Sequence, residues 1–160
     1  YYGDRGAQIV DEDSEPGDDF GARVPIEWEA AELQAEKLGM RTVILRTGLV
    51  LTKHGGLVKQ LLLPFKLGLG GPLGSGEQFM SWIHLDDEVG IILWARDNEQ
   101  VSGIVNATAP NPVTNREFSK ALGNAVHRPT VIPRRRTANR SSKASGRSWP
   151  IRMPAWSWAS

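Results

Sequence analysis

The chain has 160 residues, the length of about one domain, and its 40% apolar and 23% charged residues exclude collagen-like, coiled-coil and wholly disordered proteins. No apolar run approaches the roughly 18 residues of a membrane-spanning helix, and the absence of cysteine excludes disulfides and thiolate metal sites and favours a reducing, cytoplasmic location. The net charge of +1 conceals a break, because residues 1–117 carry 18 acidic against ten basic side chains, whereas residues 118–160 carry nine basic side chains and no acid.

Apolar periodicity predicts helices and strands in alternation along the chain. In chain order, we expect a helix over Glu27–Leu38, strands over Arg41–Arg46 and Leu49–Thr52, a helix over Leu57–Phe65, a strand over Phe79–Ile83, a helix from Asp86, a strand over Ile104–Ala107 and a helix from Thr114. This order predicts an α/β fold with a mainly parallel sheet.

Local signals predict where several of these helices begin and end. We expect Pro25 in the first turn of the first helix, where proline is tolerated, and we expect Pro64 to end the second helix. The third helix is expected to turn its apolar residues, from Val89 to Trp94, into the core. Thr114 and Glu117 have the spacing of a capping box at the start of the fourth helix.

A glycine-rich loop over Gly68–Gly76 invites comparison with nucleotide-binding motifs. The dinucleotide fingerprint needs a strand before it, a helix directly after it and glycines at G-x-G-x-x-G spacing, and this loop meets none of these conditions. Glycines also permit a close approach of the backbone. The loop is therefore better interpreted as a flexible wall of a substrate cleft than as a phosphate site.

The three histidines are too scattered to predict a metal site. His54 and His127 are expected in solvent, whereas His84 stands at a strand end just before a helix, where α/β folds place their ligands. His84 is therefore either a catalytic proton donor or an imidazole that is hydrogen-bonded to the capping backbone. Asp86 and Asp87 are expected to be caps of that helix.

The last part of the chain, residues 134–160, is rich in arginine, serine and tryptophan and has neither the helical nor the strand period. Such a segment cannot bury a face of its own, so we expect disorder there. We interpret it as a frame-shifted end of the sequence. The alternative is a real basic arm, and nucleic-acid binding by such an arm would weaken steeply with salt.

Several short motifs stand in one order along the first 133 residues. They are YYG at 1–3, DEDS at 11–14, PGDDF at 16–20, LRTGLVL at 45–51, LPFKLGLGG at 63–71, WIHLDD at 82–87 and NATAP at 106–110. In this combination the chain resembles an atypical extended short-chain dehydrogenase/reductase. The group that it resembles is the epimerase-family proteins, which are sugar-nucleotide epimerase-like and carry a C-terminal domain of unknown function.

The resemblance implies the C-terminal part of a Rossmann-type doubly wound parallel sheet plus a small substrate lobe. Residues 1–51 would be the rear part of an NAD(P)-binding domain, and residues 52–133 a substrate lobe with returning Rossmann elements. The cofactor would be NADP or NAD, with most of its site upstream of Tyr1 in a longer protein, so that the chain is an N-terminally truncated fragment. Arg46, Gly48 and Val50 would lie beside the nicotinamide end of the cofactor.

The resemblance also locates the usual acid/base pair, a tyrosine with a lysine four residues later. Phe20 and Val24 stand at these positions, and neither side chain has a proton to exchange. Tyr2 either points into the cleft as a substitute catalytic residue or packs at a strand end. Arg23 either supplies a positive charge near the missing lysine or lies exposed on a helix.

Arg46 has two open interpretations, since it can meet a phosphate or carboxylate or can pair with Glu29. Two functions also remain open. One is an NAD(P)-dependent oxidoreductase or epimerase that acts on a small or sugar-nucleotide substrate, with Tyr2 and His84 as candidate catalytic residues. The other is an NAD(P)-binding protein without turnover. A small-molecule partner is expected, without nucleic acid, membrane or metal, and the oligomeric state is not predicted.

Overall fold

The computed structural model describes residues 1–130 and contains helices and strands in alternation. In chain order these are α1 (Phe20–Lys37), β1 (Val43–Thr47), β2 (Leu49–Leu51), α2 (Gly56–Lys66), β3 (Phe79–Met80), β4 (Trp82–His84), α3 (Leu85–Asp97), β5 (Gly103–Ala107), β6 (Val113–Thr114) and α4 (Asn115–Ala125). The predictions for residues 134–160 lie outside the described residues.

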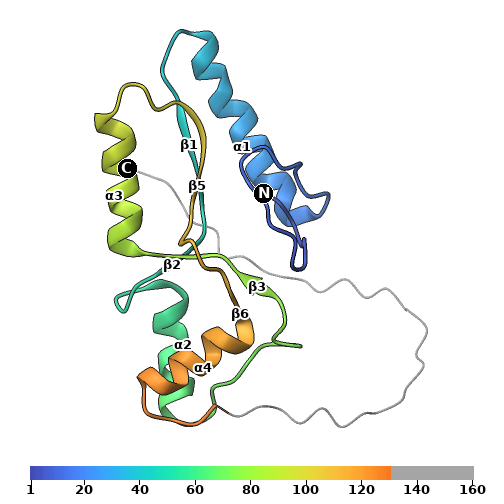
Figure 1. Cartoon of the computed structure of the whole chain (residues 1–160), viewed down its shortest axis with the longest axis vertical. Helices are drawn as coiled ribbons and strands as arrows, with labels where there is room; N and C mark the ends of the chain where they lie inside the picture. The colour runs from blue at the N-terminus through green and yellow to red at the C-terminus, as the bar shows by residue number, and fades with distance from the viewer. Residues whose placement is uncertain (131–160) are drawn as a thin grey trace, which may run out of the picture.

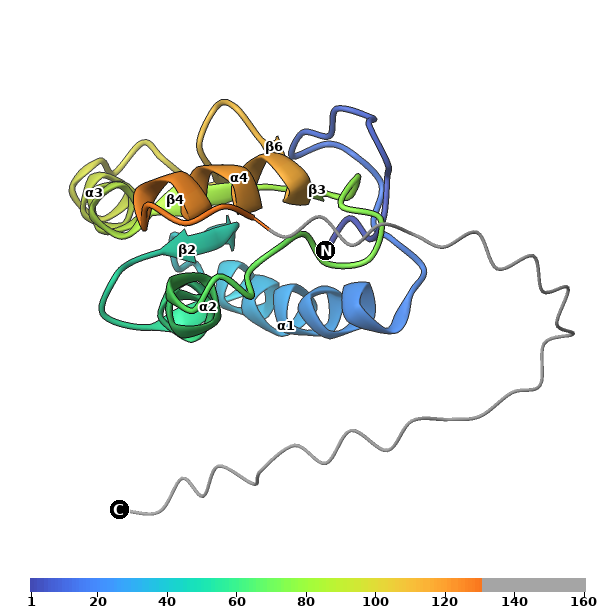
Figure 2. The same ribbon diagram turned by 90° about the horizontal axis from the view of Figure 1, so that it is seen from below.

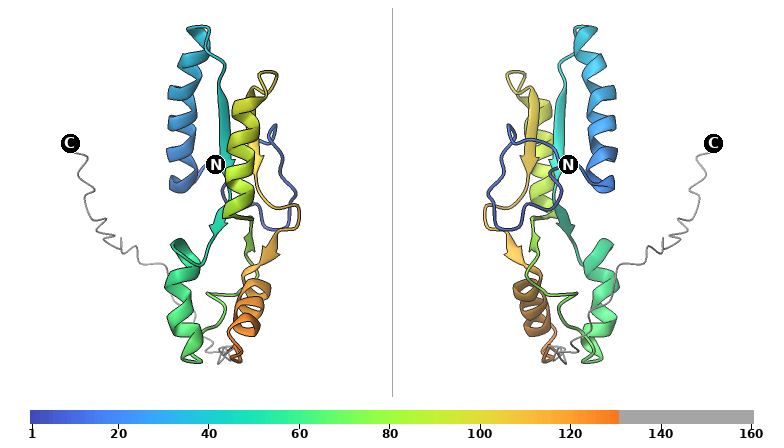
Figure 3. Two further views of the ribbon diagram at one scale, coloured as in Figure 1. Left: turned by 90° about the vertical axis from the view of Figure 1, so that its left-hand side faces the viewer. Right: turned by 90° about the vertical axis from the view of Figure 1, so that its right-hand side faces the viewer.

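The strands form three pairs, of which two are parallel. β1 pairs with β5 and β2 pairs with β4 in parallel, while β3 and β6 form a short antiparallel pair. Figure 1 shows the β1–β5 pair between α1 and α3, and Figure 3 shows the same arrangement from the sides. The expected α/β fold with a mainly parallel sheet is confirmed.

A second group of elements lies beyond the carboxyl ends of β1 and β5. α2 and α4 lie there close together, with the β3–β6 pair beside α4, as Figures 1 and 2 show. Ile44 of β1, Ile83 of β4 and Ala107 of β5 are buried, and in the second group Phe65 of α2 and Phe118 of α4 are buried. The carboxyl ends of β1 and β5 therefore lie where the two groups of elements meet.

α1 begins seven residues earlier than the sequence predicted. Asp19 caps the helix, because its side chain accepts a hydrogen bond from the backbone N–H of Ala22. The predicted place of Pro25 in the first turn is therefore wrong, since Pro25 lies inside the helix. The prediction that Pro64 ends α2 is also wrong, because the helix continues to Lys66.

α3 differs from its prediction at its cap and on its apolar face. The N-cap is His84 rather than Asp86 or Asp87, which lie in the first turn. The residues expected inside are half-exposed, since Val89, Ile92, Leu93 and Trp94 each keep more than 40% of their surface. Periodicity groups apolar residues on a helix but does not show which element covers them.

The remaining local predictions agree with the structure except for one strand. Thr114 and Glu117 form the expected capping box at α4. The single strand expected over Phe79–Ile83 is two strands, β3 and β4, and they pair with different partners. His127 follows the end of α4 with a positive φ of 56°. Within residues 1–130, no helix is both long enough and apolar enough to span a bilayer.

Candidate functional site

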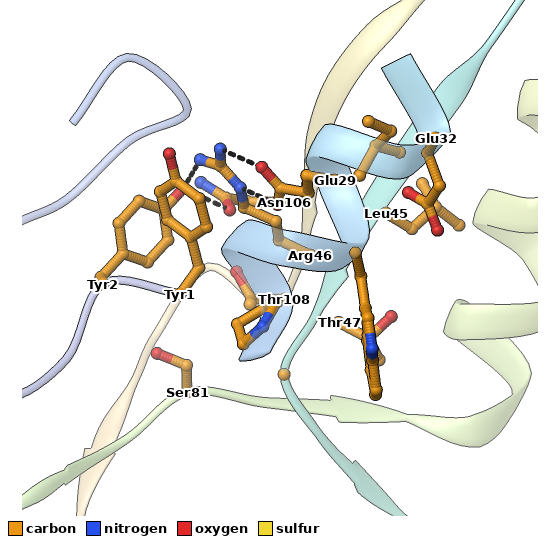
Figure 4. A pocket seen from close by; sticks show the side chains of 14 residues that line it. Tyr1, Tyr2, Glu29, Glu32, Leu45, Arg46, Thr47, Ser81, Asn106 and Thr108 are labelled. Carbon is orange, nitrogen blue, oxygen red and sulfur yellow. Dashed lines mark hydrogen bonds and ion pairs between the residues drawn. The ribbon is translucent and has the colours of Figure 1, made fainter. Parts of the chain in front are cut away.

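A pocket of about 540 Å³ lies at the carboxyl ends of β1 and β5. Its walls come from α1, from the ends of the two strands and from Tyr1 and Tyr2 at the start of the chain, and Figure 4 shows these side chains around it. Open α/β sheets bind their ligands at the carboxyl ends of parallel strands. The position of this pocket therefore makes it the candidate functional site, and we call it the site pocket.

Arg46 of β1 is at the centre of the polar groups in the site pocket. Its Nε donates to Oε1 of Glu29 at 2.8 Å, and its Nη2 donates to Oε2 of the same carboxylate at 2.9 Å. The side chains keep only 7% and 10% of their surface, so this two-pronged ion pair is largely removed from water. Of the two interpretations of Arg46, the structure forms the pair with Glu29.

The other nitrogen of the guanidinium faces the start of the chain. Nη1 donates to the hydroxyl oxygen of Tyr2 at 2.8 Å and to the backbone oxygen of Glu12 at 3.1 Å. The ring of Tyr1 lies against the guanidinium, 3.4 Å from the carbon to the ring centroid, as a cation–π contact. Burial lowers the pKa of Arg46, but hydrogen bonds with Glu29 and Tyr2 outweigh it and raise the pKa above its usual value.

Tyr2 connects Arg46 to the end of β5. Its hydroxyl donates to Oδ1 of Asn106 at 2.8 Å while accepting from Arg46, so both the proton and the lone pair of the phenol are engaged. The backbone of this segment is held by Arg5, whose Nε donates to the carbonyl of Tyr2 at 3.0 Å. Figure 4 shows the phenol and the guanidinium side by side. Tyr2 thus lines the site pocket while its hydroxyl is bonded to a residue at the end of β5, so both interpretations of Tyr2 stay predictions.

Gly48 lines the site pocket and lies where the backbones are closest. A Cβ at this position would lie 3.0 Å from the carbonyl oxygen of Ser81 and 3.0 Å from Cγ2 of Thr108. Val50 lies further along, in β2, where it is paired with Ile83 of β4, and it does not line the site pocket. Of the three residues expected beside the cofactor, the structure thus brings Arg46 and Gly48 together and places Val50 outside.

His84 lies at the carboxyl end of β4 and outside the site pocket. Its Nδ1 accepts a hydrogen bond from the backbone N–H of Asp86 at 3.2 Å, and its side chain keeps 53% of its surface. The structure therefore has the capping arrangement that was one of the two interpretations of His84. Its role as a proton donor stays a prediction from the sequence.

The positions of the missing tyrosine and lysine lie at the start of α1. Phe20 is the first residue of the helix and keeps 81% of its surface, and Val24 is partly exposed one turn later. Arg23 is exposed, as its second interpretation expected. The glycine-rich loop, Gly68–Gly76, does not line the site pocket.

Sequence reasoning missed three polar residues of this region. Asn106 holds the Tyr2 hydroxyl, and its backbone N–H donates to Oε1 of Glu12 at 2.7 Å. Glu88 of α3 is 92% buried and accepts from Oγ1 of Thr47 at 2.8 Å, while its other oxygen has no partner within residues 1–130. Asn106 and Glu12 belong to the NATAP and DEDS motifs, which were the available signal, whereas Glu88 follows the WIHLDD motif in an acidic run without any distinguishing pattern.

Parallel strands whose carboxyl ends frame a pocket are typical of α/β proteins, and comparisons with known proteins identify the Rossmann type. The crystal structure of the human epimerase family protein SDR39U1 with NADPH superposes with a TM-score of 0.74 at 41% identity, over 82% of this chain and 45% of that one. A nucleoside-diphosphate sugar epimerase from Corynebacterium glutamicum gives a TM-score of 0.72 at 42% identity, over 78% and 27%. The predicted Rossmann-type fold is confirmed.

Among curated proteins, epimerase family protein MT2273 of Mycobacterium tuberculosis is 46% identical over 132 residues, which are 82% of this chain and 44% of the relative. No protein-family model matches the chain. The resemblance predicted from the motifs is confirmed, because the chain is similar to epimerase family proteins and is 46% and 48% identical to two of them. It spans less than half the length of the curated relatives that it matches.

Proposed function

We propose that the chain forms the nicotinamide end of an NAD(P) site in an oxidoreductase or epimerase-like protein that acts on a small or sugar-nucleotide substrate. The observation that carries this proposal is the group of Tyr2, Arg46 and Asn106 in a pocket at the carboxyl ends of two parallel strands. The human relative was crystallised with NADPH, which supports the choice of cofactor. NADP and NAD both remain candidates.

The residues of the site pocket fit the nicotinamide end of the cofactor better than its pyrophosphate. Tyr1 and Trp28 offer aromatic surfaces for a flat ring, and Thr108 and Asn106 offer polar atoms for a carboxamide. The pyrophosphate needs cationic groups or the N–H groups at the start of a helix. Arg46 is the one cation that lines the site pocket within residues 1–130, and Glu29 already holds it. This supports a division in which most of the cofactor binds outside this chain.

When bound, a reduced nicotinamide supplies a hydride. The chain's own contribution is the Tyr2 phenol, which carries a proton that it can deliver to a substrate oxygen or accept from one. Arg46 donates a hydrogen bond to the phenol oxygen and holds it beside Asn106. Arg46 thereby acts as a positioning residue for the Tyr2 hydroxyl. Gly48 has no side chain that would occupy space in the site pocket.

The second candidate function is NAD(P) binding without turnover. Phe20 and Val24, which carry no exchangeable proton, support it. The hydrogen bond from Tyr2 to Asn106 also supports it, because a phenol proton held by an amide is less available to a substrate. The two candidate functions therefore differ in whether the Tyr2 hydroxyl transfers a proton to or from a substrate.

Two further assignments are part of the same proposal. Residues 1–51 carry the rear part of the NAD(P)-binding domain, and residues 52–133 carry the substrate lobe together with the returning elements α3 and β5. The position of α2, α4 and the β3–β6 pair beyond the strand ends supports this division. A cytoplasmic location stays a prediction from the cysteine-free sequence.

The test uses a chimera in which residues 1–130 replace the matched part of the Mycobacterium tuberculosis relative. NADPH and NADH binding are measured by calorimetry for the chimera and for the chain alone, and oxidation of the reduced nicotinamide is followed over a panel of carbonyl compounds. The proposal expects NAD(P) binding by the chimera and much weaker binding by the chain. A chimera that folds without binding either cofactor contradicts the proposal.

The variants Tyr2→Phe and Tyr1→Phe separate the two candidate functions. If Tyr2 delivers the proton, its variant loses about 100-fold in turnover with unchanged cofactor affinity, since acid/base groups contribute on the order of that factor. Tyr1→Phe keeps the aromatic contact with Arg46 and retains turnover. Cofactor binding with no oxidation of any carbonyl compound in the panel favours the second function.

A further inference from the structure

We propose that a second pocket, next to the site pocket, binds the body of an uncharged, partly apolar carbonyl substrate rather than a sugar nucleotide. This substrate pocket has a volume of about 390 Å³ and lies between residues 6–10 and residues 108–112. Ser81 and Thr108 line both pockets, so that one ligand can reach from the substrate pocket to the Tyr2 hydroxyl. The inference rests on the proposed function, because the site pocket would hold the reacting group.

The walls of the substrate pocket are mostly apolar. Val10, Phe79 and Ala109 contribute apolar surface, and two prolines extend the wall beyond Ala109. Its polar side chains, including Ser81 and Thr108, are neutral, and no Lys, Arg, Asp or Glu of residues 1–130 lines it. Pockets of a few hundred cubic ångströms with apolar walls and a few polar groups are typical sites for small organic ligands.

The charges around both pockets oppose a nucleoside diphosphate. The diphosphate of a sugar nucleotide carries about two negative charges, which proteins bind with arginine, lysine or the free N–H groups of a helix start. The site pocket contains Glu29 and Glu32 against the single cation Arg46, which is paired with Glu29. The nearby start of α4 is already occupied by its capping box, and α3 begins with three acidic residues.

The wall formed by residues 6–10 is held at its base. Nη2 of Arg5 donates to the carbonyl oxygens of Glu15 at 2.8 Å and Pro16 at 2.9 Å, which closes the segment into a loop. Glu12 ties the same loop to β5 through the backbone N–H of Asn106. These hydrogen bonds fix the loop beside β5, so that ligand binding at the substrate pocket needs little ordering of the chain.

The test measures ligand binding rather than turnover. Acetophenone and UDP-glucose are titrated separately into the isotope-labelled chain, and the backbone amide signals are followed by NMR. We expect acetophenone to shift signals of Val10, Phe79 and Ala109 in a saturable way, with an affinity in the millimolar range. UDP-glucose at the same concentrations is expected to leave these signals unshifted.

A matched pair of variants locates the effect. Phe79→Ala is expected to weaken acetophenone binding about fivefold, because it removes an aromatic wall and a loss of about 1 kcal/mol has that effect. Phe20→Ala removes a phenyl ring that is even more exposed and lines none of the pockets, so its affinity stays that of the parent chain. The shift map of the parent chain decides the question if Phe79→Ala does not fold.

The outcomes are distinct. Saturable UDP-glucose binding at the signals of the substrate pocket, or acetophenone shifts confined to other parts of the chain, overturns the inference. Failure of the chimera to bind NAD(P) overturns the proposed function and leaves this measurement unaffected, since acetophenone binding is recorded without cofactor. Acetophenone bound at the substrate pocket, together with UDP-glucose that does not bind, supports the inference in either case.

Discussion

Replacing Glu29 with glutamine tests the structural centre of the site. The Glu29 side chain keeps only 10% of its surface and accepts two hydrogen bonds from Arg46, at 2.8 and 2.9 Å. Glutamine has nearly the same shape, but it leaves a buried guanidinium without its counter-charge. Breaking a buried pair by removing one partner costs about 3–5 kcal/mol, and we take the lower value because the pocket is open to solvent on one side.

A loss of about 3 kcal/mol changes the folded-to-unfolded ratio roughly 150-fold. The assay is urea unfolding of the chain followed by tryptophan fluorescence, to which Trp28 in the same helix contributes. Glu32→Gln is the matched control, because Glu32 lies one turn away on α1 with its side chain exposed, and its substitution is expected to change stability by less than about 0.5 kcal/mol. Equal stabilities of the two variants would refute the reasoning.

Further predictions concern other parts of the structure. Gly48→Ala is expected to lower the free energy of unfolding by about 1–2 kcal/mol, because the new Cβ meets Ser81 and Thr108 at 3.0 Å. Gly90→Ala, in the open middle of α3, is expected to raise it by about 0.5–1 kcal/mol. Thermal unfolding measures both, and a loss of stability at both positions would contradict this prediction. Hydrogen bonds from the backbone N–H and the hydroxyl of Thr114 lower the pKa of Glu117 below its ordinary 4.5. Its stabilising effect is therefore complete above pH 4.5 and is lost as the pH falls through the lowered pKa, and melting curves of Glu117→Gln are expected to lack this loss. The double variant Glu29→Gln/Arg46→Met is expected to lose less stability than the sum of the single variants, and strict additivity would show that the two side chains are not coupled.

The strands and the start of α4 were predictable because their signals are local. β1 and β5 are runs of aliphatic residues, and the capping box is defined by two residues three positions apart. The start of α1 was missed because Pro25 is also a helix-start signal, while the true cap, Asp19, precedes a segment of weak periodicity. The exposed face of α3 was missed for a different reason. Hydropathy shows that its side chains favour burial, but whether they are buried depends on which elements pack against the helix.

Individual residues of the site were predictable from the sequence, whereas most of the contacts between them were not. The sequence pointed to Tyr2, Arg46 and Gly48 through motif positions, and it left the Arg46–Glu29 pair open. Glu29 and Arg46 are 17 positions apart on a helix and a strand, and Tyr2 is 104 positions from Asn106. Contacts over such separations depend on how the elements pack, which no local pattern in a single sequence records. His84 shows the opposite case, because its capping role follows from its immediate neighbours.

The most direct test of the proposed nicotinamide site is a crystal structure of the chimera with NADPH. We predict that the nicotinamide ring lies in the site pocket, in contact with Gly48 and with its carboxamide within hydrogen-bonding reach of Tyr2 or Asn106. A nicotinamide ring bound elsewhere, with the contacts between Tyr2, Arg46 and Asn106 unchanged and no ligand atom in the site pocket, would contradict the proposal.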